Sequence, residues 1–178
     1  MPLIREVSTR SMQMCAHDTY MDCPYYEQLM YVGDTRLEVL THYVMQADDR
    51  LPRRAVELFD YSRKEWGFTT ERVTSRTLQL CPTFSFIWSW MVRDYLYWRG
   101  DLDWVADRMI GVRCSLEYAR PYLNADGLLE DLPGWPFTDW VRDWKNGNPP
   151  GALDGVSSCV NLHYLLALQT AADVERRI

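Results

Sequence analysis

The sequence predicts an all-α domain of antiparallel helical hairpins, and three observations support this prediction. Apolar residues recur at intervals of three and four over several separate segments, which is the period of an amphipathic helix. No stretch of six residues alternates cleanly between apolar and polar side chains, so strands are expected to be minor at most. One segment is apolar nearly all round while others have a polar face, as in helices packed in two layers.

Two helices are expected early in the chain, over residues 35–47 and 52–65. Pro52 suits the first turn of the second helix, because proline lacks the backbone N–H that a first turn leaves unbonded. Gly67 ends this helix, and the polar residues 69–82 that follow are expected to be irregular. The apolar face of the first helix consists of Leu37, Leu40 and Val44.

The segment 84–98 is the most apolar part of the chain, and we expect it to form a helix that is buried on most sides. Gly100 ends this helix and Asp101 caps the next one, whose apolar residues recur at alternating intervals of four and three up to Leu123. A last helix is expected from about Ser157 to the end of the chain. Its apolar residues are Leu162, Leu165, Leu166, Ala172 and Val174.

A long segment before the last helix, residues 124–155, contains three Trp, four Pro and five Gly. Loops of this length inside compact domains are usually functional or disordered, and tryptophan-rich loops are seldom disordered. Residues 170–178, by contrast, have the pattern of a helix interior, with no glycine or proline to end it. We therefore expect a functional loop, and a domain over residues 1–178 that is cut at its C-terminal end.

Composition restricts the classes of partner. The 178 residues are 47% hydrophobic and 25% charged with a net charge of −6, which fits a soluble globular domain and argues against a nucleic-acid partner. No apolar run approaches the roughly eighteen residues that a membrane span needs, so no membrane partner is expected. The first six residues lack the pattern of a signal peptide, which predicts a cytoplasmic protein.

The five cysteines and three histidines are widely spaced, with no pair at metal-ligand spacing. They predict reduced, mostly buried thiols, no metal ion and no cofactor. The eight Trp and eleven Tyr residues suit either a ligand with flat apolar faces, such as a sugar, or a large helical core. Composition alone therefore leaves the function open.

The densest group of chemically capable side chains is a thirteen-residue segment that begins at Asp22 and contains three carboxylates. Pro24 disfavours helix at the start of this segment and Gly33 allows a close turn at its end, so the carboxylates are expected on a loop that leads into a helix. Sugar hydrolysis requires carboxylates among aromatic rings, because one carboxyl protonates the glycosidic oxygen while others bind hydroxyls. The alternative is structural: Asp34 caps the helix, and Asp22 and Glu27 are solvated loop charges.

The segment resembles the signature of bacterial α-L-rhamnosidases (glycoside hydrolase family 78), which begins Asp-Cys-Pro, has Glu at the sixth position and ends in Gly-Asp. In this chain the matching residues are Asp22-Cys23-Pro24, Glu27 and Gly33-Asp34. Further similar stretches extend the resemblance over nearly the whole chain. They are Met12-Gln13-Met14-Cys15-Ala16-His17, Asp34-Thr35-Arg36-Leu37, Phe84-Ser85, Met91-Val92-Arg93-Asp94-Tyr95 with Gly100-Asp101, and Asn124-Ala125-Asp126-Gly127.

The resemblance implies about half of an (α/α)6 barrel, with a sugar pocket at one end and without the β-sandwich domains that usually precede it. It also implies an inverting hydrolase of terminal α-L-rhamnosides, with Glu27 as general acid and with Asp22 and Asp34 binding hydroxyls or tuning that acid. The base of the family is a Glu on a later helix. No residue of this chain corresponds to it, so the base is expected outside the chain.

The signature differs from that of better-known members at three positions. Those members carry Arg before the Glu and a Gly-Trp pair ahead of Gly-Asp, where this chain has Tyr26, Met30 and Tyr31. Loss of the Arg removes a charge that would help to set the pKa values of the carboxylates. Tyr31 is expected to replace a tryptophan in one wall of the pocket.

The loop 131–140 is the second candidate part of the site, because loops between barrel helices line the pocket in this family. Trp135, Asp139 and Trp140 are expected to contact the sugar, the alternative being a loop packed onto its own rings. Three polar residues before Pro82 are further candidates to reach the pocket: Arg72, Arg76 and Gln79.

Half a ring of helices would leave apolar faces open to water, so we expect the isolated chain to self-associate and to hydrolyse no rhamnoside. The competing hypothesis is a non-catalytic helical module that binds carbohydrate or another partner, because such a module needs no base. A generic helical repeat is a third hypothesis, although no internal repeat of fixed period is present.

Overall fold

The computed structural model describes residues 2–65 and 67–178, which form six α-helices and very little strand, so the all-α prediction is confirmed. Within the described residues, none of the helices combines the length and the apolar composition that a membrane span requires. The helices are α1 (Pro2–Met14), α2 (Val32–Met45), α3 (Arg50–Ser62), α4 (Pro82–Arg99), α5 (Leu102–Ala119) and α6 (Ser158–Glu175). The remaining elements are strands β1 (Met30–Tyr31) and β2 (Arg72–Val73) and the 3-10 helices η1 (Arg120–Tyr122) and η2 (Lys145–Gly147).

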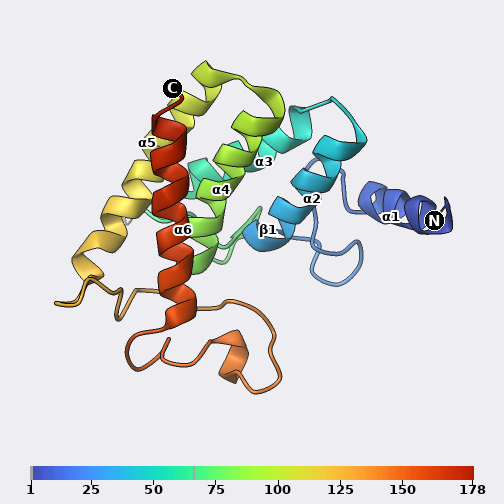
Figure 1. Cartoon of the computed structure of the whole chain (residues 1–178). Helices are drawn as coiled ribbons and strands as arrows, with labels where there is room; N and C mark the ends of the chain where they lie inside the picture. The colour runs from blue at the N-terminus through green and yellow to red at the C-terminus, as the bar shows by residue number, and fades with distance from the viewer. Residues whose placement is uncertain (1, 66) are drawn as a thin grey trace.

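Helix α4 is the centre of the fold, and α2, α3, α5 and α6 all pack against it (Figure 1). It is buried on most sides, as its composition predicts, and Trp88 has no exposed surface. The indole N–H of Trp88 donates a hydrogen bond to the backbone oxygen of Val56 in α3 at 3.1 Å, which satisfies this buried polar group. The last turn departs from the prediction, because Tyr97 and Trp98 are 56% and 46% exposed.

Helix α5 has one polar face, as its apolar period predicts, and Val105, Met109 and Val112 are buried in the core. The Asp101 carboxylate accepts a hydrogen bond from the backbone N–H of Trp104 at 3.1 Å, so it is the expected N-cap. The preceding Gly100 has a φ of +76°, a left-handed conformation that lets glycine end α4 at little steric cost.

The buried face of α2 is not the predicted one. Leu37 and Val44 are largely exposed, whereas His42 is buried at the interface with the core. His42 tolerates burial because its Nδ1 is hydrogen-bonded to the Tyr20 hydroxyl at 2.8 Å and its Nε2 to the backbone oxygen of Asp48 at 2.7 Å. Apolar spacing misses this face, because two of its five buried residues, Thr35 and His42, are polar.

The buried face of α6 also differs from the prediction. Of the five residues expected to be buried, only Val174 is buried. Ala172 is exposed, and Leu162, Leu165 and Leu166 are 57%, 47% and 48% exposed. Helix α6 carries two apolar faces, and spacing alone does not show which of them packs on the bundle. The buried face consists of Val160, Tyr164, Ala167, Thr170, Ala171 and Val174.

Strands β1 and β2 join two segments that lie far apart in the sequence. They pair antiparallel with Tyr31 opposite Arg72, and the backbone N–H of Val32 donates to the backbone oxygen of Glu71 at 3.0 Å. The segment 69–82, expected to be irregular, therefore contains a short strand that holds the start of α2 in place.

The cysteines are free thiols, but the expectation that most of them are buried was wrong. Cys81, at the start of α4, is buried, whereas Cys114 on the polar side of α5 is exposed. The other three are partly buried: Cys15 follows α1, Cys23 lies in the loop before β1, and Cys159 lies in the first turn of α6.

A buried ion cluster joins α3 to α5. The Asp60 carboxylate, which is 7% exposed, lies 2.6 Å from Nη2 of Arg63 and 3.5 Å from Nε of Arg108. Gly111 allows this approach, because a Cβ atom there would lie 2.4 Å from Oδ1 of Asp60 and 2.7 Å from the ring of Trp88. The two helices therefore depend on a residue without a side chain at their contact.

Gly111→Ala should lower the free energy of unfolding by about 2 kcal/mol, because an added methyl group in a packed contact forces neighbouring atoms apart. Chemical denaturation monitored by circular dichroism measures this loss. The matched control is Gly155→Ala, where a Cβ atom would meet no other atom within 4 Å, and a change near zero is expected. Equal losses in both variants would contradict the interpretation.

We propose that the exposed leucines of α6 cause the isolated chain to self-associate, because large apolar faces are rarely left open to water. The double variant Leu162→Glu and Leu165→Glu should then shift the apparent mass toward that of a monomer. Size-exclusion chromatography with light scattering measures this mass. Leu102→Glu, at an exposed leucine of α5, is the control that should leave the mass unchanged. A wild-type chain that is monomeric at high concentration would contradict the proposal.

Candidate active site

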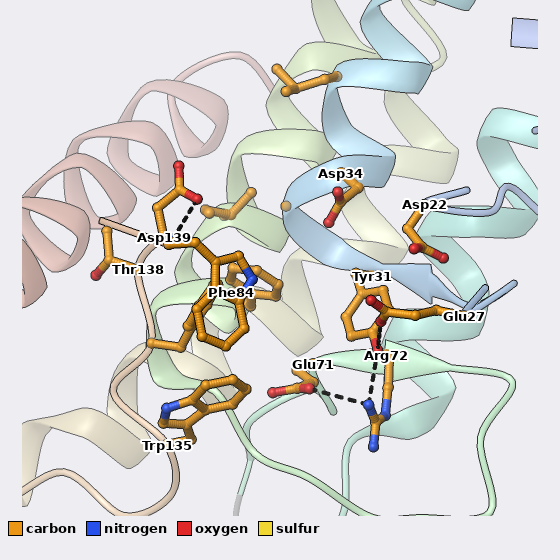
Figure 2. Close-up of a pocket in the computed structure, with 15 residues that line it drawn as sticks. Asp22, Glu27, Tyr31, Asp34, Glu71, Arg72, Phe84, Trp135, Thr138 and Asp139 are labelled. Carbon is orange, nitrogen blue, oxygen red and sulfur yellow. Dashed lines mark hydrogen bonds and ion pairs between the residues drawn. The ribbon is translucent and has the colours of Figure 1, made fainter. Parts of the chain in front are cut away.

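A pocket of about 470 Å³ opens where β1, the first turns of α2 and α4, and the loop between α5 and α6 come together. Figure 2 shows Asp22, Glu27 and Tyr31 on one side of it and Trp135, Thr138 and Asp139 on the other. All seven residues predicted for the site line this pocket, namely Asp22, Glu27, Tyr31, Asp34, Trp135, Asp139 and Trp140. Their chemical roles stay predictions.

The loop that carries Glu27 is closed by two hydrogen bonds across its base. The Asp22 backbone N–H donates to the Leu29 backbone oxygen at 2.9 Å, and the Leu29 N–H donates to Oδ1 of Asp22 at 3.0 Å. Gln28 turns the chain back with a φ of +56°. Asp22 is therefore both a pocket residue and the residue that holds the loop shut.

Glu27 is exposed at the pocket, and its carboxylate has a defined partner. The Tyr31 hydroxyl donates a hydrogen bond to Oε2 of Glu27 at 2.5 Å, and Nη1 of Arg72 donates to the Tyr31 oxygen at 2.8 Å. Partial burial, together with the hydrogen bond to Glu27, raises the pKa of Tyr31 to about 12. Tyr31 therefore keeps its proton at neutral pH.

Asp34 lies in the first turn of α2 and is not its N-cap, which corrects the structural alternative. The cap position is Tyr31, and its side chain makes no capping hydrogen bond. Burial raises the pKa of the Asp34 carboxyl, and the charges of Asp22, Glu27 and Asp139 raise it further. The carboxylates of the signature thus act on one another electrostatically.

Gly33 serves packing rather than the turn that the sequence predicts. Helix α2 already begins at Val32, so Gly33 lies inside its first turn. A Cβ atom at this position would lie 3.0 Å from the ring of Phe84, which lines the pocket from α4. The glycine therefore brings the two helices close together beneath the site.

The opposite wall is a cluster of aromatic rings. The Trp135 ring lies 4.6 Å from that of Phe137, which in turn lies 5.2 Å from Trp140 and 5.7 Å from Phe84, measured between centroids. Backbone hydrogen bonds anchor this loop, since the Trp135 N–H donates to the Leu80 oxygen at 2.9 Å. The loop thus packs on its own rings and lines the pocket at the same time.

Two charged residues of the segment 69–82 line the pocket, and only one of them, Arg72, is a candidate from the sequence. Glu71 is 2% exposed, and burial raises the pKa of its carboxyl to about 7. Of the three candidates before Pro82, Arg72 lines the pocket, whereas Arg76 and Gln79 do not. A polar segment without a periodic pattern offers no sequence signal that would single out Glu71.

Glu38 lies one turn after Asp34 on α2 and is not among the residues that line the pocket. Burial, together with the charges of Asp34 and Asp22, raises the pKa of its carboxyl to about 8. Its Oε2 atom is buried and makes no hydrogen bond. No group of three or more His, Cys, Asp or Glu side chains that could hold a metal ion occurs within the described part of the chain.

The comparisons with known proteins agree with this geometry. A family model described as the bacterial alpha-L-rhamnosidase 6 hairpin glycosidase domain matches residues 3–177. The chain therefore belongs to the bacterial α-L-rhamnosidase six-hairpin glycosidase domain family, and the resemblance predicted from the signature is confirmed. A comparison with curated proteins gave no match.

Two solved structures share the fold. The GH78 family rhamnosidase of Bacillus sp. GL1 is 26% identical, with a TM-score of 0.86 over 96% of this chain and 17% of that one. The rhamnosidase from Klebsiella oxytoca, solved with rhamnose bound, is 20% identical, with a TM-score of 0.80 over 96% of this chain and 33% of that one. The chain thus spans a third or less of the length of these relatives.

The buried carboxyl of Glu38 predicts a pH-dependent stability. Its pKa is higher in the folded chain than the ordinary value of 4.5, so between about pH 4.5 and 8 the folded state binds more protons than the unfolded state. Stability therefore falls as the pH rises through this window. Glu38→Gln removes this proton linkage, so its melting temperature should gain on that of wild type as the pH rises. The gap between the two melting temperatures should be about 2–4 °C larger at pH 8 than at pH 5.

Thermal melts at the two pH values measure this difference. Glu6→Gln, at an exposed glutamate of α1, is the control, and the gap between its melting temperature and that of wild type should not change with pH. The prediction would be contradicted if the melting temperature of Glu38→Gln, relative to that of wild type, decreased as the pH rises.

Proposed function

We propose that the pocket binds a terminal α-L-rhamnose unit and belongs to an inverting glycoside hydrolase. One observation carries this proposal: a single pocket gathers all three carboxylates of the signature and faces them with the aromatic loop. Carboxylates supply the proton and the hydroxyl contacts that glycoside cleavage needs, while flat rings pack against the apolar face of a sugar. Membership of the family supports the same reaction class.

Glu27 is the general acid in this proposal. Its carboxyl is exposed at the pocket, and the hydrogen bond from Tyr31 uses Oε2 and leaves Oε1 available. Asp22 and Asp34 accept hydrogen bonds from sugar hydroxyls, because both carboxylates line the pocket beside Glu27. The sugar ring packs on Trp135 and Trp140, and Asp139 contacts its hydroxyls from the same loop.

The catalytic base comes from outside these 178 residues. An inverting enzyme holds its base about 6.5–9.5 Å from the acid, on the opposite face of the sugar, so that a water fits between them. The two solved relatives are at least three times as long as the stretch that this chain covers, so they contain ample further structure that could carry such a group. The isolated chain is therefore expected to bind L-rhamnose without hydrolysing rhamnosides.

Glu27→Gln should lower the turnover of a rhamnoside with a poor leaving group by about 10²–10⁴-fold, because general acid catalysis supplies an effect of this size. Binding of the sugar should change little, since glutamine has nearly the same shape. The measurement is steady-state kinetics in a form of the protein that carries this domain together with its base. Turnover largely retained would rule out Glu27 as the acid.

Sugar binding is tested on the 178-residue chain itself by thermal melts with and without millimolar L-rhamnose. A ligand that binds only the folded state raises the melting temperature. We expect a rise in wild type and in Glu27→Gln, and its loss in Asp34→Ala. Asp126→Ala, in the exposed turn at 124–127, is the control that should keep the rise. A wild-type melt that rhamnose does not move would contradict the binding role.

A further inference from the structure

The two-residue sheet places one pair of side chains beside the acid. Strands β1 and β2 pair with Tyr31 directly opposite Arg72, although the two are 41 positions apart in sequence. The guanidinium carbon of Arg72 lies 5.6 Å from the centre of the Tyr31 ring. A sheet this short adds little stability of its own, so its main effect is to align this pair.

The direction of each hydrogen bond in the pair follows from its chemistry. A guanidinium only donates, so the Tyr31 oxygen must accept from Nη1 of Arg72, which lies 2.8 Å away. The same nitrogen is 3.9 Å from Oε1 of Glu71, beyond hydrogen-bonding distance. The hydroxyl hydrogen of Tyr31 is therefore directed to Oε2 of Glu27, at 2.5 Å.

We propose that Arg72 and Tyr31 are positioning residues that fix which oxygen of Glu27 faces the substrate. This inference rests on the proposed role of Glu27 as general acid. Because Oε2 accepts the hydrogen of Tyr31, the transferable proton of Glu27 resides on Oε1. In the reaction that proton moves from Oε1 to the leaving-group oxygen as the bond between this oxygen and the anomeric carbon breaks, and Glu27 becomes a carboxylate still held at Oε2. A water oxygen bonds to the anomeric carbon from the opposite face and gives its proton to the base outside these 178 residues.

Tyr31 itself does not transfer a proton in this arrangement. Its pKa of about 12 keeps the hydroxyl protonated at neutral pH, and Arg72 has no acceptor to offer it. The other ionisable groups at this end of the pocket are Asp22 on the loop, Asp34 on α2 and Glu71 beside β2. Carboxylates such as these act on Glu27 through charge alone, whereas the pair acts through a directed hydrogen bond.

The experiment is carbon-13 NMR of the 178-residue chain with labelled glutamate side chains. The signal of Glu27 is identified by its loss in Glu27→Gln, and its titration midpoint is measured in four chains: wild type, Tyr31→Phe, Arg72→Met and the double variant. Removing the Tyr31 hydroxyl takes a donor from the carboxylate. The midpoint should therefore move to higher pH by about 1 unit in Tyr31→Phe.

Arg72→Met should also move the midpoint of Glu27 to higher pH when Tyr31 is present. If Arg72 acts on Glu27 through the Tyr31 hydroxyl, this effect should fall to less than half in the Tyr31→Phe background, because the hydroxyl that transmits it is gone. Arg76→Met, at an exposed arginine of the same segment, is the matched control and should leave the midpoint unchanged.

Two outcomes would overturn the proposal. An unchanged midpoint in Tyr31→Phe would show that the hydroxyl does not act on Glu27, and this variant keeps the ring and therefore the packing. An equal effect of Arg72→Met in both backgrounds would mean that Arg72 acts directly as a charge. If Arg72→Met does not fold, as judged by circular dichroism, Arg72→Gln replaces it in the comparison of the four chains.

The outcome is separable from that of the proposed function. Loss of turnover in Glu27→Gln with no coupling among the three residues would refute the positioning role alone. Coupling in the titration with full turnover in Glu27→Gln would leave the hydrogen-bond relay intact and refute general acid catalysis, and the assignment of Oε1 as the proton-carrying oxygen with it.

Discussion

Burial of α4 is the constraint on which the rest of the structure depends. A helix that is apolar nearly all round is unfavourable at a surface, so four other helices cover it. The first turn of this helix also builds the site, because Phe84 lines the pocket and the Thr83 hydroxyl donates a hydrogen bond to the backbone oxygen of Phe137. The packing that holds the domain together therefore also positions the aromatic wall.

Close backbone approaches connect this core to the pocket. Gly33 brings the start of α2 against Phe84, and Gly134 brings the aromatic loop against the segment before α4. A Cβ atom at Gly134 would lie 2.7 Å from the backbone oxygen of Leu80, and its φ of +101° suits glycine alone. A loop without regular structure is thus held by a rigid scaffold, which is the usual arrangement for residues that bind or react.

The pKa values of the carboxyl groups in and near the pocket follow from their burial and from their closeness to one another. Burial raises the pKa values of Asp34, Glu38 and Glu71, and neighbouring carboxylates raise them further. The pKa values of about 8 for Glu38 and about 7 for Glu71 mean that this end of the domain holds protons near neutral pH. Arg72 is the cation that lines the pocket, and its hydrogen bond goes to Tyr31, which contacts Glu27.

Spacing and residue type predict the helical class, the buried character of α4, the Asp101 cap and the residues of the signature, because these are local properties of the chain. The sequence also predicts that the loop at 131–140 is part of the site. Tertiary structure alone decided which faces of α2 and α6 pack inward, since both helices carry more than one plausible buried face. It alone placed Arg72 opposite Tyr31, because a contact between residues 41 positions apart depends on how the intervening helices fold.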